Sequence, residues 1–406
     1  MANNGMKRRD FFGKAAAGLV TTGLSLPLLN AGTTEQKELN KFVYRTLGRT
    51  KLRIPIVSFG VMNSDSPDLL NRALDAGVNH LDTAHGYLRG NSERVIGEVL
   101  ERRGGRDKVY VATKMYFARD REKGEFIKES GQQGFGATEE EFFKQLEISL
   151  KRLRTDYVDI LYLHSLYTPK MVTYEPMMNA LVKAKKQGKA RFIGTTTHHD
   201  ESNIIRSTVD AEIYDVVLTV YNFVHEKREE IKKSIQYAVD KGVGVVAMKT
   251  QGGRRYQEES KEEINHLAAL KWVLNDENVC TTIPGMTAFE QLDLNLKAMS
   301  DIALSQKEKE DLRMVAGRKG LLFCQNCRSC VSSCPSRVEI PDLMRSYMYA
   351  RSYGNYVQAR ITVAELPSQR GLDVCRTCSS CSADCVNGIN IASRMQSLIE
   401  DKLYMG

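Results

Sequence analysis

The sequence predicts an α/β protein with two domains, a (β/α)8 barrel followed by a small, mainly α-helical domain rich in cysteine. Two observations indicate the barrel. Short apolar runs alternate eight times with segments of helical periodicity, and they do so over about 250 residues, the usual length of this fold. A third observation indicates the second domain, since eight of the nine cysteines lie within residues 324–385. At 406 residues the chain can bury both cores.

The elements of the barrel follow in chain order. Residues 43–48 and the segment after them predict a short hairpin that covers the bottom of the barrel. The apolar runs that predict the barrel strands are residues 54–60, 79–83, 109–114, 157–163, 191–195, 216–221, 243–248 and 281–284. Helical periodicity lies between them, for example over 139–153 and 227–239. No G-x-G-x-x-G fingerprint follows the first strand, which disfavours a doubly wound dinucleotide-binding sheet. The long connection 116–137 predicts either a lid or a partner-docking surface.

Polar side chains stand at the ends of three predicted strands. Asp82, His85 and Tyr87 end one run, Lys114 ends the next, and His164 follows a third. Because parallel α/β folds place their chemistry at the carboxyl ends of the strands, we expect these residues to share a site. Each of them alone is equally compatible with an ordinary loop or capping role.

Three stretches carry a resemblance to a known family: Leu81-Asp82-Thr83-Ala84-x-x-Tyr87, Val109–Lys114 and Tyr157–His164. Over roughly residues 42–316 the chain resembles the aldo-keto reductases. The resemblance implies that Tyr87 is the general acid and that Lys114 lowers its pKa. It further implies that Asp82 keeps Lys114 charged and that His164 orients the substrate carbonyl. The implied reaction is reversible hydride transfer between NADP(H) or NAD(H) and a small-molecule carbonyl or alcohol.

The resemblance also implies a cofactor site, and here the chain departs from the family pattern. Leu218 stands where the family often has a carboxamide-binding glutamine, and Thr287 stands where NADPH-preferring members often have an arginine. The implied cofactor-binding residues are Thr196, Thr197 and His198 at the carboxamide, Tyr221 on the next strand, Met248 and Lys249 at the pyrophosphate, and Gly285, Thr287, Glu290 and Gln291 at the adenosine end.

The cysteines repeat the spacing C-x2-C-x2-C-x3-C. The two copies are Cys324, Cys327, Cys330 and Cys334, then Cys375, Cys378, Cys381 and Cys385. This spacing predicts two [4Fe-4S] clusters, because three closely spaced thiolates wrap one cubane and a fourth completes it. Zinc ribbons use separated pairs, and disulfides form poorly at such spacing. By resemblance to ferredoxins, each fourth cysteine would serve the other cluster. Residues 341–361 predict a helical segment between the two motifs.

Residues 1–32 resemble a twin-arginine signal peptide. Arg8 and Arg9 are followed by Phe11 and by a weakly apolar run that is too short and mild for a comfortable membrane span. The alternative is a disordered basic tail. We expect export to the periplasm by the twin-arginine machinery, with a membrane tether if the signal is retained. Residues 33–41 are polar and aperiodic and predict a linker.

The predicted organisation is therefore a signal over 1–32, a linker over 33–41, a barrel over 42–316 and an iron–sulfur domain over 317–406. The net charge is +8, of which +3 lies in the first thirty residues. Two clusters with their thiolates would add about −4 and bring the body near neutrality, so the charge gives no case for nucleic acid as a partner.

The predicted function is that of an exported oxidoreductase. Nicotinamides pass electron pairs as hydride, clusters pass single electrons, and no stretch resembles a flavin site that would convert between them. Three roles therefore stay open for the clusters: structure, exchange with a redox partner protein, or chemistry without nicotinamide turnover. The alternative function is an iron–sulfur electron-transfer or docking subunit with a catalytically silent barrel.

Overall fold

Eight parallel strands form the centre of the fold in the computed structural model, which describes residues 42–121, 123–131, 134–252, 264–316 and 324–404. The sheet order is β12-β11-β10-β9-β8-β5-β4-β3, so consecutive barrel strands lie side by side. The strands are β3 Phe59–Gly60, β4 His80–Asp82, β5 Tyr110–Met115, β8 Val158–Leu166, β9 Ala190–Thr197, β10 Val216–Val220, β11 Gly244–Met248 and β12 Thr281–Thr282. The predicted signal and linker lie outside the described residues.

The first and last strands meet and close the sheet into a barrel. The amide of Ser58 donates to the carbonyl of Thr282 at 2.8 Å, and the amide of Gly60 donates to the carbonyl of Pro284 at 3.1 Å. A Cβ at Gly60 would lie 2.6 Å from the carbonyl oxygen of Ile283, so a side chain at this position would force the seam apart. The predicted (β/α)8 barrel is confirmed.

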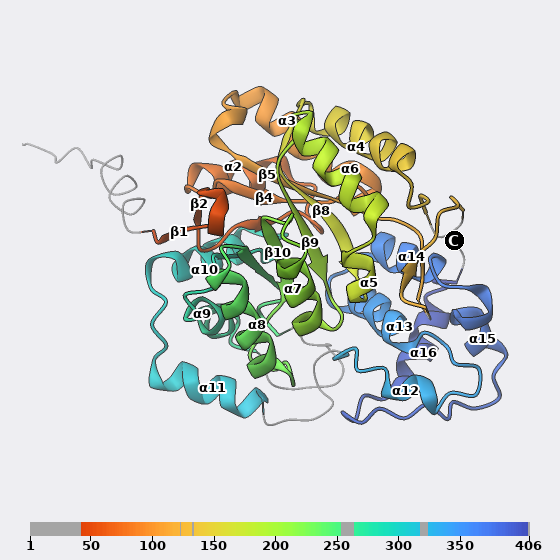
Figure 1. The fold of residues 1–406 in the computed structure, drawn as a ribbon. Coiled ribbons are helices and arrows are strands. Elements are labelled where there is room, and N and C mark those ends of the chain that lie inside the picture. The colour runs from red at the N-terminus through yellow and green to blue at the C-terminus, as the bar shows by residue number, and fades with distance from the viewer. Residues whose placement is uncertain (1–41, 122, 132–133, 253–263, 317–323, 405–406) are drawn as a thin grey trace, which may run out of the picture. The chain divides into compact units, whose positions relative to one another are not determined.

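Helices cover the outside of the barrel (Figure 1). They are α2 Pro67–Asp75, α3 Asn91–Arg103, α4 Glu139–Leu153, α5 Pro169–Val172, α6 Glu175–Lys186, α7 Glu201–Asp210, α8 Arg228–Asp240, α9 His266–Leu274, α10 Phe289–Ser300 and α11 Gln306–Ala316. Helix α4 shows why these segments fold locally. Thr138 caps it by accepting from the amide of Glu141, and acidic residues fill its first turn. Its buried residues, such as Phe142 and Leu146, pack toward the sheet.

The predicted strand 54–60 is divided in the structure. Its first part is β2, Arg53–Pro55, which pairs antiparallel with β1, Tyr44–Thr46, in the predicted hairpin. Its last part is β3, which pairs with β4. Between the two, the backbone changes its hydrogen-bond partner. The amide of Ile56 donates to the carbonyl of Val43 in the hairpin, whereas the amide of Ser58 donates to the carbonyl of Thr282, where the barrel closes. An uninterrupted apolar run concealed this change from the sequence pattern.

The C-terminal domain is built from short helices around its own apolar core. They are α12 Ser329–Ser332, α13 Ile340–Tyr347, a π-helical turn Met348–Ser352, α14 Tyr356–Ala364, α15 Leu372–Thr377 and α16 Ile391–Glu400. The helical segment predicted over 341–361 is interrupted. Gly354 has a φ of +64°, and Asn355 caps α14 by accepting from the amide of Gln358 at 2.9 Å.

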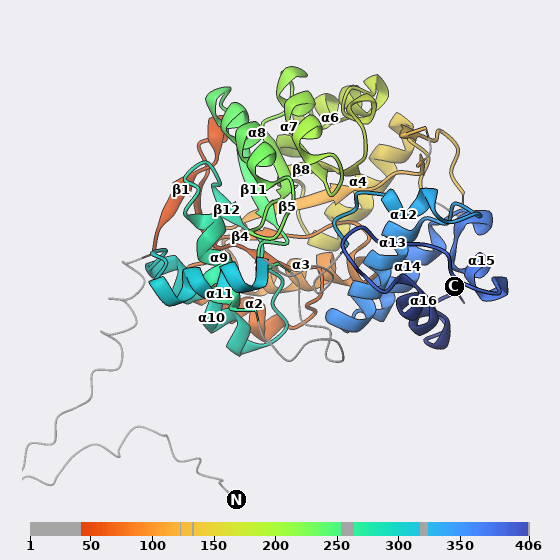
Figure 2. The same ribbon diagram turned by 90° about the horizontal axis from the view of Figure 1, so that it is seen from below.

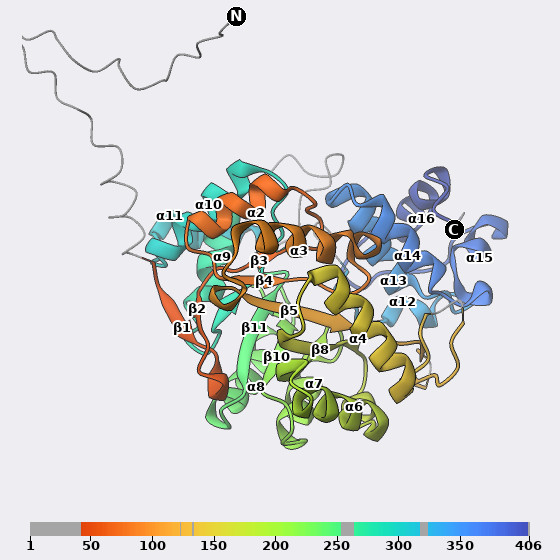
Figure 3. The same ribbon diagram turned by 90° about the horizontal axis from the view of Figure 1, so that it is seen from above.

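The C-terminal domain lies at the end of the barrel opposite the β1–β2 hairpin (Figures 2 and 3). Residues 41–406 form one compact unit, so the barrel and this domain are packed together. The domain thus covers the carboxyl ends of the strands, where the predicted catalytic residues lie. None of the helices that the structure describes combines the length and apolarity that a membrane span requires.

Candidate active site

A buried ion pair lies at the carboxyl ends of β4 and β5. The Lys114 ammonium donates to Asp82 Oδ1 and, at 2.7 Å, to the carbonyl of Thr83. Both side chains are almost fully buried, with 1 % and 2 % of their side-chain surface exposed. Such a pair is held in one geometry, because separating the charges would leave each of them buried and alone.

Tyr87 and His164 adjoin this pair. The Lys114 ammonium lies 5.0 Å from the centre of the Tyr87 ring. The Tyr87 and His164 rings meet edge to face with centroids 5.7 Å apart. The structure therefore brings together the four residues predicted to be catalytic. His85 lines the same cavity, and its Nδ1 lies 3.0 Å from the Ser149 hydroxyl.

An irregularity in β8 places His164. The register between β8 and β9 shifts between Leu163 and Leu166, and Ser165 has a φ of +58°. A bulge of this kind changes the direction of a side chain at the end of a strand. Arg119 fixes the bulge because its guanidinium donates to the carbonyls of His164, at 3.1 Å, and Ser165.

Burial dominates the protonation of this site. Burial and the neighbouring Asp82 raise the pKa of Tyr87, so it is a phenol at neutral pH. Burial lowers the pKa of Lys114, and Asp82 opposes that shift. Burial, together with Lys114 and Arg119, holds the pKa of His164 well below its ordinary value. The expected lowering of the Tyr87 pKa by Lys114 is therefore not seen, because Asp82 neutralises that lysine and the desolvation of the phenolate outweighs it.

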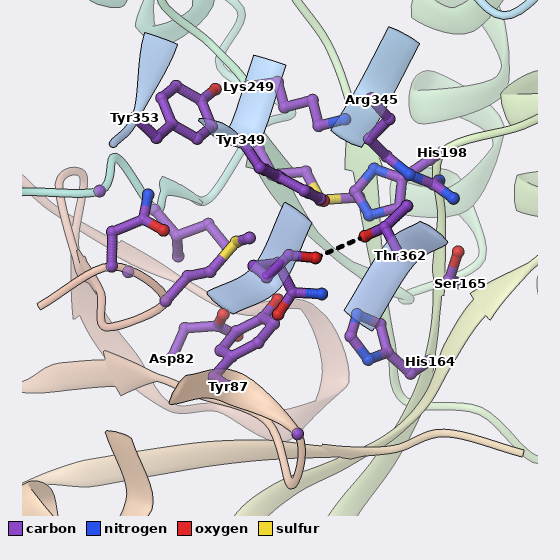
Figure 4. A pocket seen from close by; sticks show the side chains of 18 of the residues that line it. Asp82, Tyr87, His164, Ser165, His198, Lys249, Arg345, Tyr349, Tyr353 and Thr362 are labelled. Atoms are coloured by element: carbon purple, nitrogen blue, oxygen red, sulfur yellow. Dashed lines mark hydrogen bonds between the residues drawn. The ribbon is translucent and has the colours of Figure 1, made fainter. Parts of the chain in front are cut away.

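Three of the four residues, Asp82, Tyr87 and His164, line a cavity of about 530 Å³ between the barrel and the C-terminal domain, and Lys114 lies buried behind Asp82 (Figure 4). The barrel supplies its floor, including Asp82, Tyr87 and His164. The C-terminal domain supplies a group of lining residues that we call the roof: Arg345, Tyr349, Tyr353, Gln358, Ile361, Thr362, Ala364 and Glu365. The candidate active site is thus built by both domains.

Buried polar contacts fix the roof to the barrel. Tyr116 donates from its hydroxyl to Glu365 at 2.8 Å. Arg121 pairs with Asp342, and lies 3.6 Å from Glu365. Asn355 donates to the side-chain oxygen of Asn63 at 2.6 Å. The first two contacts come from the connection 116–137, which carries the hairpin β6 Arg119–Asp120 and β7 Glu125–Phe126. Of the two roles predicted for this connection, the structure favours docking, with the partner being a domain of the same chain.

The residues predicted to bind a cofactor divide into two sets. Those that line the cavity are His198, Met248, Lys249, Gly285, Thr287 and Gln291. Those that do not line it are Thr196, Thr197, Tyr221 and Glu290. The cavity continues from Tyr87 past the loop after β11 to α10, where Gln251 donates to Asn295 at 2.8 Å.

Strand geometry explains three of the second set, whereas Glu290 is exposed on α10. Side chains alternate across a strand, and Leu218 and Val220 face the barrel interior, so Tyr221 faces outward. The Tyr221 ring lies 5.2 Å from that of Trp272, and its hydroxyl donates to Asp276. Thr196 accepts from the amide of Ser165 at 2.7 Å, and Thr197 donates to the carbonyl of Leu166. These side chains are occupied within the barrel wall.

The roof residues were missed by the sequence reasoning. Arg345, Tyr349 and Tyr353 lie on α13 and just after it, where the pattern indicated only helix packing between the cysteine motifs. Their presence in the cavity depends on contacts that span more than 200 residues, such as Tyr116 with Glu365. Arg345, a charged residue within the predicted helical segment 341–361, was the one local signal.

The eight clustered cysteines are free thiols that fall into two groups. Burial raises the pKa of Cys330 to about 12, and its charged neighbours are Cys324, Cys385 and Cys327. Burial likewise raises the pKa of Cys375 to about 11, with Cys334, Cys381 and Cys378 as neighbours. Each group takes its fourth cysteine from the other motif, which is the division implied by the ferredoxin resemblance. Four convergent thiols are the donor set that a [4Fe-4S] cluster requires.

The first cysteine group adjoins the barrel site. The Asn326 side chain, between Cys324 and Cys327, donates to the carbonyl of His198 at 3.1 Å and contacts His199. A small second cavity is lined by Cys324 together with His198 and Lys249. In the second group, Cys378 and Cys381 are exposed. Within the described ranges, no three His, Cys, Asp or Glu side chains are arranged to hold a single metal ion.

A (β/α)8 barrel with Asp, Tyr, Lys and His gathered at the carboxyl ends of its strands has the architecture of a carbonyl oxidoreductase. The family model described as Aldo/keto reductase family matches residues 58–267, more than half of the chain. The chain therefore belongs to the aldo/keto reductase family. A second model, 4Fe-4S dicluster domain, matches residues 318–386, so the C-terminal domain is an iron–sulfur domain.

Two relatives match along most of their own length. L-galactose dehydrogenase of Arabidopsis thaliana is 26% identical over 314 residues, which cover 68% of this chain and 94% of that protein. L-glyceraldehyde 3-phosphate reductase of Escherichia coli K12 is 24% identical over 325 residues, covering 65% and 90%. The solved structure of aldo-keto reductase AKR11C1 from Bacillus halodurans, in its holo form, has a TM-score of 0.54 at 22% identity and covers 68% of this chain and 96% of that one. That structural likeness shows the fold alone.

Proposed function

We propose that this protein reversibly reduces small carbonyl compounds with a nicotinamide cofactor, and that its C-terminal domain holds two [4Fe-4S] clusters. The observation that carries the proposal is the convergence of Tyr87, His164 and the buried Lys114–Asp82 pair on one cavity. Membership of the aldo/keto reductase family supports a small carbonyl or alcohol as the substrate.

The lining of the cavity fits an extended dinucleotide. The wall from Met248 to Gln251 joins the wall formed by Gly285, Thr287 and Gln291, so one ligand could reach from Tyr87 to α10. Burying most of such a ligand in a pocket of several hundred Å³ is typical of cofactor sites.

When bound, the nicotinamide supplies the hydride. Tyr87, which burial keeps protonated, donates the proton to the oxygen of the carbonyl as the alcohol forms. The Lys114 ammonium, paired with Asp82, lies 5.0 Å from the centre of the Tyr87 ring, and this buried pair keeps the wall beside the phenol in one geometry. His164, neutral at pH 7, orients the carbonyl, and the roof excludes water.

We further propose that the clusters exchange electrons with the barrel site or with a redox partner. Cys324, Cys327, Cys330 and Cys385 would hold the cluster nearer the barrel, and Cys334, Cys375, Cys378 and Cys381 the other. Because Cys324 shares a cavity with His198 and Lys249, which also line the main cavity, a cluster held by Cys324 would lie beside the candidate active site. This proximity argues against the alternative, an electron carrier with a silent barrel.

The test is an anaerobic titration of the holoprotein with NADPH and then NADH. Bound nucleotide is assayed, and cluster redox state is followed by electron paramagnetic resonance. We expect nucleotide binding together with turnover of a carbonyl panel, and a cluster signal if the two centres exchange electrons. Absence of both nucleotide binding and turnover would overturn the reductase proposal and leave the electron carrier. Turnover with silent clusters would retain the reductase and contradict electron exchange between the clusters and the barrel site.

Export is a separate proposal, supported by the pattern at Arg8, Arg9 and Phe11. The twin-arginine route carries folded proteins, which suits a protein whose clusters are inserted before it crosses the membrane. Cell fractionation of the full chain should find it in the periplasm, and the double change Arg8→Lys and Arg9→Lys should retain it in the cytoplasm with its clusters intact. Unchanged periplasmic delivery of this double variant would contradict the proposal.

A further inference from the structure

Two cationic side chains meet at the roof side of the cavity. Lys249, directly after β11, and Arg345, on α13, both line the cavity. Arg345 is the strongest charged neighbour of Lys249. Figure 4 shows both side chains together with His198, across the cavity from Asp82 and Tyr87. They come from different domains, so this arrangement exists only where the roof covers the barrel.

The carboxylates nearby contact other groups. Glu201, the acidic group that most raises the pKa of Lys249, lies 3.8 Å from His225. Asp342 forms ion pairs with both Arg345 and Arg121. Glu365 lies 3.6 Å from Arg121 and accepts a hydrogen bond from the Tyr116 hydroxyl. In the part of the chain that the structure describes, the Lys249 ammonium has no ion-pair partner. Two like charges brought together out of bulk water repel strongly. An anion placed between them would relieve that repulsion and gain two charge-assisted contacts.

His198 adds a third unsatisfied group. Its Nδ1 is buried and has no hydrogen-bond partner, and Lys249 and Arg345 are its strongest charged neighbours. A buried polar atom of this kind ordinarily has a partner, in the protein or in a bound ligand. Because the two cations can only donate, the ligand atoms that suit this end of the cavity are acceptors.

We propose that Lys249, Arg345 and His198 form a subsite for an anionic group of the substrate, a carboxylate or a phosphate, while its carbonyl lies at Tyr87 and His164. The inference rests on the proposed function and names its substrate class: short carbonyl compounds that carry an acid group. An uncharged sugar or steroid would leave the Lys249 ammonium without an ion-pair partner. The pyrophosphate of a dinucleotide has the same chemistry, so the test must separate the two sources.

The test compares two aldehydes of four carbons, succinic semialdehyde and butanal, which differ by one carboxylate. The preference of the holoprotein is the ratio of kcat/KM for succinic semialdehyde to kcat/KM for butanal. This ratio should fall at least tenfold in Lys249→Met, because a hydrogen bond to a charged group is lost. This variant breaks no ion pair that the described residues form, so folding should survive. Arg345→Met should act in the same direction, and Arg345→Lys should restore part of the preference. Lys170→Met, on the surface beside Glu125, is the matched control.

Three results would overturn the proposal. One is an equal loss for both aldehydes. Another is a raised KM for the nicotinamide with the acid preference unchanged, which would assign the cations to the cofactor phosphates. The third is a shifted cluster potential with unchanged kinetics, which would assign them to the cluster at Cys324. If no carbonyl is turned over, calorimetry with succinate and succinamide still decides the matter: succinate should bind more tightly, and Lys249→Met should remove the difference.

Discussion

Replacement of Tyr87 by phenylalanine is expected to lower kcat for carbonyl reduction by ~10²–10⁴-fold, the usual contribution of a positioned general acid. The change removes one oxygen and keeps the ring that meets His164 edge to face. Nicotinamide binding should therefore stay within about twofold of the wild type, since only an interaction made in the transition state is lost. Steady-state kinetics and nucleotide titration measure the two quantities separately.

The pH dependence follows from the direction of the Tyr87 shift. Burial and Asp82 raise its pKa above the ordinary value of about 10, so the phenol keeps its proton throughout the neutral range. Carbonyl reduction should therefore lose no activity through Tyr87 between about pH 6 and 9. Tyr214→Phe is the matched control, because that buried hydroxyl donates to the carbonyl of Val172 in the barrel wall, away from the cavity. If Tyr87→Phe turns over like Tyr214→Phe, Tyr87 is not the acid.

The change Asp342→Asn should destabilise the protein by ~3–5 kcal/mol, the usual cost of removing one partner from a buried ion pair. Asp342 is 1% exposed and serves both Arg121 and Arg345. The amide keeps the shape but leaves the Arg345 guanidinium without a carboxylate and Arg121 with Glu365 alone. Chemical denaturation, followed by circular dichroism and by the visible absorbance of the clusters, measures the loss. A loss below about 1 kcal/mol, typical of surface pairs, would contradict this account of the roof.

The same carboxylate makes the stability depend on pH. Burial alone would raise the pKa of Asp342, but the guanidiniums of Arg121 and Arg345 hold it well below its ordinary range. A carboxyl whose pKa is depressed on folding stabilises the native state above its unfolded value of about 3.9, and that stabilisation is lost as the pH falls toward the folded value. The difference in the free energy of unfolding between wild type and Asp342→Asn should thus be at its full value at pH 7 and should shrink below about pH 4. Glu125→Gln, which removes an exposed pair from the same connection, should show neither effect.

The sequence was sufficient to predict those features that depend on local periodicity. Each barrel strand occupies a short apolar run, and Asp82, Lys114 and His164 stand at the ends of such runs. Their meeting follows from parallel strands ending at one face of the barrel. The cysteine spacing likewise predicted two sets of four thiols, and the resemblance to ferredoxins implied that each fourth cysteine belongs to the other set.

Features that depend on which way a side chain faces were harder to predict. Tyr221 matches the family pattern in position, yet strand alternation turns it outward to Trp272. The break in the helical segment at Gly354 depends on one residue with positive φ. Arg345 and Tyr349 reach the cavity only because Arg121 and Tyr116, more than 200 residues earlier, bind the C-terminal domain. No short stretch of the sequence contains both residues of such a contact.

The shared construction of the cavity has a consequence for how this protein could acquire new substrates. Asp82, Tyr87, Lys114 and His164 belong to the barrel, whereas Arg345, Tyr349 and Thr362 belong to the domain above it. Substitutions in the iron–sulfur domain can therefore reshape the pocket without touching the four residues beneath. Divergence of substrate preference among proteins with this pair of domains should accordingly track α13 and α14 more closely than the barrel itself.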